Sequence, residues 1–202
     1  MGAEALPIVE AAPTLPVKLD LAAGQSPREG FEGVDIWPQS KHVVNLWRFP
    51  WPWADNSVDE LNCSHHIEHI PARDVSRDDL NGPLAIDFVG KDMMFAFFDE
   101  CWRILKPDAW MTVICPCARN NRAFQDPTHR RFIVSETFLY LSAEWRKLNK
   151  LDHYNVRCNF GIDVVPIVPT ELTLLHPEAQ ARRFNESWNT ILDWQARLKA
   201  IK

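Results

Sequence analysis

The stretch that most restricts the fold is residues 110–115, WMTVIC, which contain a single polar residue. A strand this apolar is typical of a sheet covered on both faces, because a strand with one solvated face alternates apolar and polar residues. Before it, residues 91–105 carry apolar side chains at spacings of three or four, and Lys106-Pro107 ends the predicted helix. A helix leading into a buried strand indicates an α/β domain.

Extended and helical segments alternate along the rest of the chain. They predict a three-layer, Rossmann-like α/β domain with a doubly wound, mostly parallel sheet. A further helix is predicted from Ser135, a suitable N-cap residue. Residues 161–168 and 171–176, joined through Pro169, are predicted to pair as a C-terminal antiparallel hairpin. Additional strands are predicted at residues 17–21, 33–36, 42–46 and 58–64.

Composition divides the chain into three parts. Residues 1–16 are rich in alanine and proline and lack periodicity, so we expect a disordered or loosely held tail. Residues 17–176 form the predicted α/β domain. Residues 177–202 are predicted to form a polar helix that packs on the core or, through aromatic residues such as Phe184 and Trp188, on a second copy in a homodimer.

Charge and composition exclude several classes of function. The net charge of −5 disfavours a protein that binds duplex nucleic acid mainly through its phosphates. No apolar run approaches the ~18 residues that a membrane-spanning helix needs. Five cysteines at irregular spacing favour reduced thiols and a cytoplasmic location over a disulfide framework. A small molecule or another protein is therefore the expected partner.

Two features at neighbouring strand ends indicate a nucleoside-containing ligand. Gly24, after the first strand, lets the backbone approach a ligand closely, and Asp35, at the end of the second, can accept both hydroxyls of a ribose. The two residues are eleven apart, shorter than the roughly twenty of a dinucleotide-binding fingerprint, and the loop has one glycine. This spacing predicts a shortened first crossover and disfavours NAD.

Four segments, in order along the chain, carry a resemblance to a known family. They are VKLDLAAGQSPREGFEGVDI (17–36), PWADNSVDELNCSHHIEHI (52–70), FFDECWRILKPDAWMTVICP (97–116) and DPTHRRFIVSETFLYL (126–141). Together they resemble the class I S-adenosylmethionine-dependent methyltransferases, in particular a compact, methyltransferase type 11-like group. The resemblance implies that the chain binds S-adenosylmethionine and transfers its methyl group to an acceptor that the sequence does not identify.

The same resemblance implies roles for individual residues. Two would lie against the methionine end of the cofactor, one would hold the ribose hydroxyls, two would meet the adenine, and two would lie near the sulfonium. Ala22 stands where the family usually has its first glycine. The implied cofactor-binding residues are Asp20 and Gly24 at the methionine end, Asp35 at the ribose, Asn45 and Leu46 at the adenine, and Ser64 and His65 near the sulfonium.

Two histidines are candidate catalytic bases for an acceptor that carries a proton. His65 lies on the implied cofactor side, and His129 lies in the DPTHRR loop. For His129, a structural hydrogen bond that fixes this loop is an equally good interpretation. A second class of function also stays open: a non-catalytic, cofactor-binding or partner subunit with a methyltransferase fold.

The cluster NCSHHIEHI also suggests zinc. His65-x-x-Glu68-His69 matches the H-x-x-E-H pattern of inverted zinc peptidases. Such a site needs a third ligand and a helix that holds both histidines, yet Pro71 follows almost at once. A zinc hydrolase is therefore the remote alternative, and no metal is expected. His66 and His69 are expected to be surface or helix-cap residues.

Overall fold

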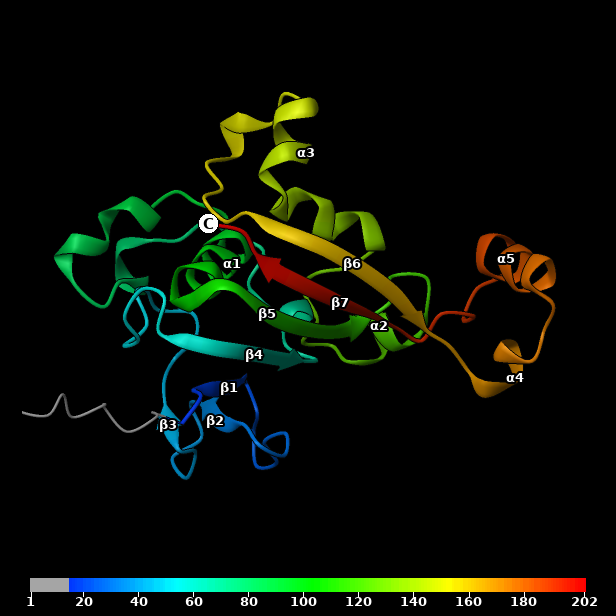
Figure 1. The fold of residues 1–202 in the computed structure, drawn as a ribbon, viewed down its shortest axis with the longest axis horizontal. Coiled ribbons are helices and arrows are strands. Elements are labelled where there is room, and N and C mark those ends of the chain that lie inside the picture. The colour runs from blue at the N-terminus through cyan, green and yellow to red at the C-terminus, as the bar shows by residue number, and fades with distance from the viewer. Residues whose placement is uncertain (1–14) are drawn as a thin grey trace, which may run out of the picture.

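A computed structural model describes residues 15–202, with only the backbone of Pro83 and Leu84, so nearly all of the predicted tail lies outside the described residues. A seven-stranded sheet in the order β3-β2-β1-β4-β5-β7-β6 forms the centre of the fold (Figure 1). Neighbours from β3 to β5 are parallel, whereas β7 is antiparallel to both β5 and β6. The predicted α/β class and the mostly parallel sheet with antiparallel strands at its C-terminal end are confirmed.

The last three strands along the chain, β5, β6 and β7, are the longest. The seven strands are β1 Lys18–Leu21, β2 Glu32–Asp35, β3 His42–Val43, β4 Val58–Ser64, β5 Leu105–Pro116, β6 Phe160–Ile167 and β7 Asp193–Ala200. The α-helices are α1 Met93–Ile104, α2 Arg122–Gln125, α3 Ala143–Leu148, α4 Thr170–Thr173 and α5 Pro177–Glu186. Short 3-10 helices cover Ile67–His69, Arg77–Asp79, Pro83–Phe88, Ser135–Leu141 and Asp152–Tyr154.

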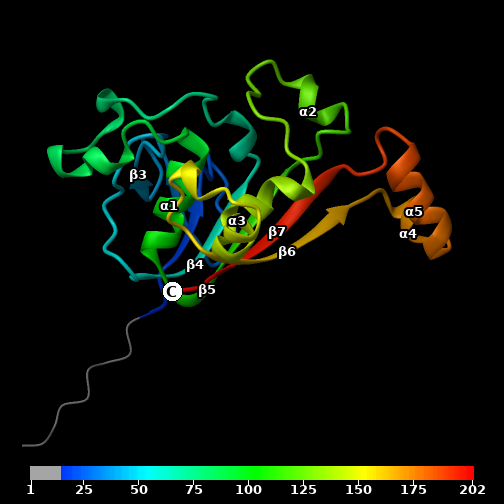
Figure 2. The same cartoon turned by 90° about the horizontal axis from the view of Figure 1, so that it is seen from above.

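Alternation along the central strands builds the core. Leu61 and Cys63 of β4 and Met111 and Val113 of β5 are fully buried, because α1 covers the face to which they point. Figure 2 shows α1 and α3 on the same side of the sheet. The predicted helix over 91–105 is thereby confirmed as α1, whose N-cap Asp92 accepts a hydrogen bond from Met94 N.

The opposite face of the sheet has a thin cover in the described chain. The crossovers 22–31 and 36–41 contain no helix, which confirms the shortened first crossover. Instead, the first loop lies over this face: Arg28 N donates to Asp20 Oδ2 (2.7 Å), and the Arg28 guanidinium donates to Asn62 Oδ1 (3.2 Å). The third layer of the predicted architecture is reduced here to a loop.

The C-terminal part differs from its predicted secondary structure. Residues 193–200, predicted to be helical, form β7, whereas residues 171–176, predicted to be a strand, overlap the short helix α4. The partner of β6 in the hairpin is therefore β7. Glutamine, arginine, lysine and alanine favour a helix locally, but pairing with strands on both sides overrides that preference. Only α5 remains of the predicted C-terminal helix, and a homodimer through it stays a prediction.

None of the helices among residues 15–202 is long and apolar enough to cross a membrane. The five cysteines are all buried, free thiols.

Candidate functional site

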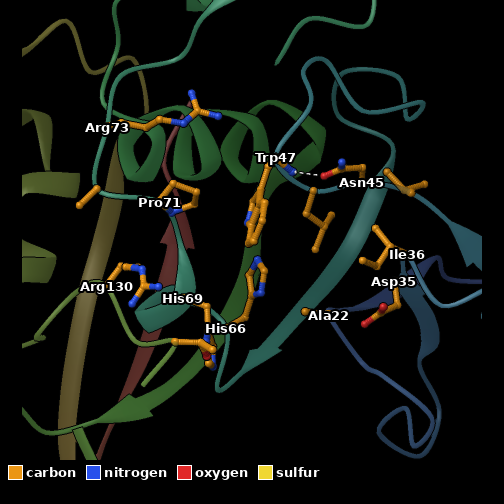
Figure 3. Close-up of a pocket in the computed structure, with 14 residues that line it drawn as sticks. Ala22, Asp35, Ile36, Asn45, Trp47, His66, His69, Pro71, Arg73 and Arg130 are labelled. Atoms are coloured by element: carbon orange, nitrogen blue, oxygen red, sulfur yellow. Dashed lines mark hydrogen bonds between the residues drawn. The ribbon is translucent and has the colours of Figure 1, made fainter. Parts of the chain in front are cut away.

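A cavity of about 760 Å³ lies at the carboxyl ends of the parallel strands. Its walls come from the ends of β1 and β2, the segment after β3, the turn after β4, and the loop that contains Thr128 and Arg130 (Figure 3). Ligands of open α/β sheets bind at this edge. The volume falls in the range of small-molecule and cofactor sites.

Asp35 ends β2 and borders the cavity. Its Oδ2 accepts a hydrogen bond from Gly24 N and its Oδ1 accepts one from Trp37 N, both at 2.9 Å. Gly24 has a φ of 55°, a conformation that glycine adopts without strain. Each carboxylate oxygen keeps a further lone pair. Asp35 therefore holds the first loop in place and can still accept hydroxyl donors from a ligand.

A turn after β3 forms a second wall. Asn45 Oδ1 accepts a hydrogen bond from Trp47 N (2.9 Å), and Leu46 is buried. The Trp47 and His66 rings lie nearly parallel, with an interplanar angle of 18° and centroids 6.4 Å apart. Burial lowers the pKa of His66 to about 4, so this imidazole is neutral at pH 7. The wall is therefore largely apolar and aromatic, with one amide.

The structure brings only some of the implied cofactor residues to this cavity. Asp35, Asn45 and Leu46 line it. Gly24 does not line it but donates a backbone hydrogen bond to Asp35. Asp20 and Ser64 line a separate polar depression on the thinly covered face of the sheet. They point there because alternate residues of a strand face opposite sides.

Asp20 holds two strands and the first loop together, and its implied role in cofactor binding stays a prediction. It is 5% exposed, accepts hydrogen bonds from Arg28 N and from Asn62 Nδ2 (both 2.7 Å), and so joins β1, β4 and the first loop. We expect Asp20→Ala to lower the free energy of unfolding by about 1–3 kcal/mol, because it leaves the buried Asn62 amide and the partly buried Arg28 N–H without their acceptor. Chemical denaturation measures this, with Asp163→Ala on the exposed side of β6 as control. Equal losses in the two variants would contradict this structural role.

Neither candidate base is among the residues that line the cavity. His65 has a φ of 52°, and its Nδ1 lies 3.3 Å from Glu68 Oε1; this carboxylate raises the pKa of His65. His129 Nδ1 lies 2.8 Å from Ala123 O, as expected of a residue that fixes its loop. The catalytic roles of His65 and His129 stay predictions.

His66 and His69 are the site residues that the sequence analysis missed. Both are half-buried and line the cavity, and His66 stands at the N-cap position of the 3-10 helix Ile67–His69, in agreement with the expected helix-cap position. The signal for them was position: they follow β4 directly, at the edge of the sheet where ligands bind.

None of the family models and none of the curated proteins compared matches this sequence. Among solved structures, one similar chain is an S-adenosylmethionine-dependent methyltransferase from Archaeoglobus fulgidus, with a TM-score of 0.56 and 16% identity over 91% of this chain and 86% of that one. Another is the S-adenosylmethionine-dependent methyltransferase from Mesorhizobium loti, with a TM-score of 0.46 and 12% identity over 93% of each chain. The first likeness shows that the fold is that of the class I methyltransferases.

Proposed function

We propose that this chain is an S-adenosylmethionine-dependent methyltransferase whose cofactor binds in the cavity at the carboxyl ends of β1 and β2. The observation that carries the proposal is the position of Asp35, which faces this cavity at the end of β2 with lone pairs free for ribose hydroxyls. The methyltransferase fold supports it.

In the proposed complex each wall has a separate task. Asp35 accepts the ribose hydroxyls, and the turn at Asn45 and Leu46 holds the adenine, whose face suits the aromatic side of Trp47. Ala22 lies at the wall formed by β1 with a φ of 56°, a conformation that glycine adopts more easily, which is consistent with the glycine that the family usually has there.

The cofactor supplies an electrophilic methyl group. Transfer is an in-line displacement in which the acceptor forms a bond to the methyl carbon as the sulfonium carbon–sulfur bond breaks. The task of the chain is then to hold donor and acceptor in line and to exclude water.

Charge on the far wall of the cavity favours an acceptor with an anionic group. Arg73 and Arg130 both line this wall. The Arg73 charge is balanced, since its guanidinium forms a bidentate salt bridge with the Asp79 carboxylate at 2.6 and 2.8 Å. The Arg130 guanidinium donates only to the carbonyls of Pro127 and His129, and it makes no ion pair within residues 15–202. A carboxylate or phosphate of the acceptor would suit Arg130.

Incubation with methyl-labelled S-adenosylmethionine and fractionated small-molecule extracts tests transfer. We expect label in an acceptor fraction and demethylated cofactor in equal amount. We also expect Arg130→Ala to reduce labelling, because it removes the unpaired cation.

A second candidate is a cofactor-binding subunit without transfer activity of its own. The observation that favours it is that neither His65 nor His129 lines the cavity. Tight binding of the demethylated cofactor, with no acceptor labelled in any fraction, would favour this candidate and contradict the first.

A further inference from the structure

We infer that Glu68, His69 and His129 form a binding site for a divalent transition-metal ion. One potential ligand atom from each of the three residues lies within 4.8 Å of the others. Glu68 and His69 belong to the 3-10 helix that follows β4, and His129 belongs to the loop after α2. The loop thus supplies a third ligand beside Glu68 and His69, whereas His65 of the H-x-x-E-H pattern is not part of the group. This proposal departs from the expectation that no metal binds.

The Glu68 carboxylate is the first argument for a cation. Glu68 is 1% exposed, and neither of its oxygens accepts a hydrogen bond from any described residue. The nearest basic side chain is His65, whose Nδ1 lies 3.3 Å from Glu68 Oε1, a long contact. A buried carboxylate without donors is costly, and a bound metal ion compensates for that cost. No other side chain in the described chain has both carboxylate oxygens buried and unpartnered.

Hydrogen bonds at Nδ1 of both histidines leave Nε2 of each ring free to bind a metal. His129 Nδ1 lies 2.8 Å from Ala123 O, which can only accept, so Nδ1 carries the proton and Nε2 keeps its lone pair. His69 Nδ1 lies 3.0 Å from Thr128 Oγ1, whose single proton is donated to Asp126 Oδ1 (2.7 Å). His69 Nδ1 must therefore donate as well. In metal sites, an acceptor that takes the proton of the other ring nitrogen orients a histidine ligand in this way.

Main-chain contacts hold the two ligand-bearing segments together. Glu68 O accepts hydrogen bonds from Arg130 N (2.7 Å) and Arg131 N (3.0 Å). The Arg131 guanidinium donates to Ile70 O (3.1 Å) and Pro71 O (2.6 Å). The His69 and His129 rings already lie against each other, with centroids 4.7 Å apart. The ligands are thus positioned before a metal arrives.

The donor set indicates the class of metal. Two imidazole nitrogens and one carboxylate suit Zn²⁺, Co²⁺ or Fe²⁺ better than Mg²⁺ or Ca²⁺, which prefer oxygen ligands. Metal–ligand bonds of about 2.0–2.2 Å require the three side chains to close slightly around the ion. Three protein ligands leave a coordination position for water or an acceptor oxygen. His69 lines the cavity (Figure 3), so the ion would border it. Metal binding itself does not depend on the proposed methyl transfer.

Calorimetric titration of the protein, freed of any histidine tag, with ZnCl₂ tests the site. We expect one Zn²⁺ per chain with a Kd below about 10 µM, and a higher unfolding temperature with Zn²⁺ present. Glu68→Gln and His129→Gln should each weaken binding at least ~100-fold, because losing a ligand costs more than losing a group that only hydrogen-bonds to a ligand, for which roughly 10- to 100-fold is typical. Glu68→Gln keeps the side-chain shape, so an unchanged circular dichroism spectrum verifies its fold.

Two matched variants make the result specific. His153→Gln, in a separate turn, should bind Zn²⁺ as the wild type does. His65→Gln should also retain binding, because His65 is not one of the three ligands. Saturable binding that is lost in His65→Gln but kept in His129→Gln would contradict the assignment. Absence of saturable binding to the wild type below about 100 µM would contradict the site altogether.

Discussion

Replacement of Asp99 by alanine is expected to lower the free energy of unfolding by about 3–5 kcal/mol, the cost of breaking a buried ion pair from one side. Asp99 Oδ2 pairs with Lys91 Nζ, and both side chains are almost completely buried. Its Oδ1 accepts hydrogen bonds from Arg157 N (2.9 Å) and Cys158 N (2.8 Å). The variant would leave a buried ammonium and two amide donors unpaired, and would disconnect α1 from the segment that leads into β6.

Urea denaturation measures this loss, and the chain offers a matched control. Asp87 pairs with Arg157 through an exposed contact in which the two side chains are 64% and 54% exposed. Exposed ion pairs contribute about 0–1 kcal/mol, so Asp87→Ala should change stability by less than 1 kcal/mol. A loss of similar size in both variants would show that the burial of Asp99 is not what matters.

Asp35→Ala is expected to weaken binding of S-adenosylhomocysteine by about 1.5–3 kcal/mol, or roughly 10- to 150-fold. The reason is that the variant removes the only carboxylate among the residues that line the cavity. It also removes the acceptor of Gly24 N and Trp37 N, so the first loop loses the hydrogen bond that holds it to the end of β2. Isothermal titration calorimetry gives the affinity, and thermal unfolding reports any loss of stability.

Glu32→Ala is the control for Asp35→Ala. Glu32 lies on the same strand but pairs with Lys41 and His42 and does not line the cavity. Its replacement should leave cofactor affinity within about twofold of wild type. If Asp35→Ala binds as tightly as Glu32→Ala, the ribose assignment is wrong.

Periodicity and loop length predicted the first two-thirds of the fold. The apolar run at 110–115 lies in the centre of the sheet as part of β5, and the eleven-residue spacing from Gly24 to Asp35 does exclude a crossover helix. The prediction for the end of the chain was wrong because residues 193–200 contain good helix formers. Ala196, Leu198 and Ala200 alternate with exposed or half-buried residues, but that signal is weak until two neighbouring strands are in place.

Site residues could be predicted from the sequence where their position depends only on where a single strand ends. Asp35 ends β2, Asn45 lies two residues after the end of β3, and both line the cavity. Asp20 could not be placed from sequence, because a one-residue change of register within β1 reverses the face to which a side chain points. The approach of His129 to Glu68 depends on main-chain hydrogen bonds between segments sixty residues apart, which no local pattern encodes.

The most direct test of the central claim is a crystal structure of the protein with S-adenosylhomocysteine. We predict nucleoside density in the cavity between Asp35 and the turn at Asn45 and Trp47, with both ribose hydroxyls within hydrogen-bonding distance of the Asp35 carboxylate. Density for the ligand in the depression beside Asp20 and Ser64, or a cavity without ligand at saturating concentration, would contradict the claim.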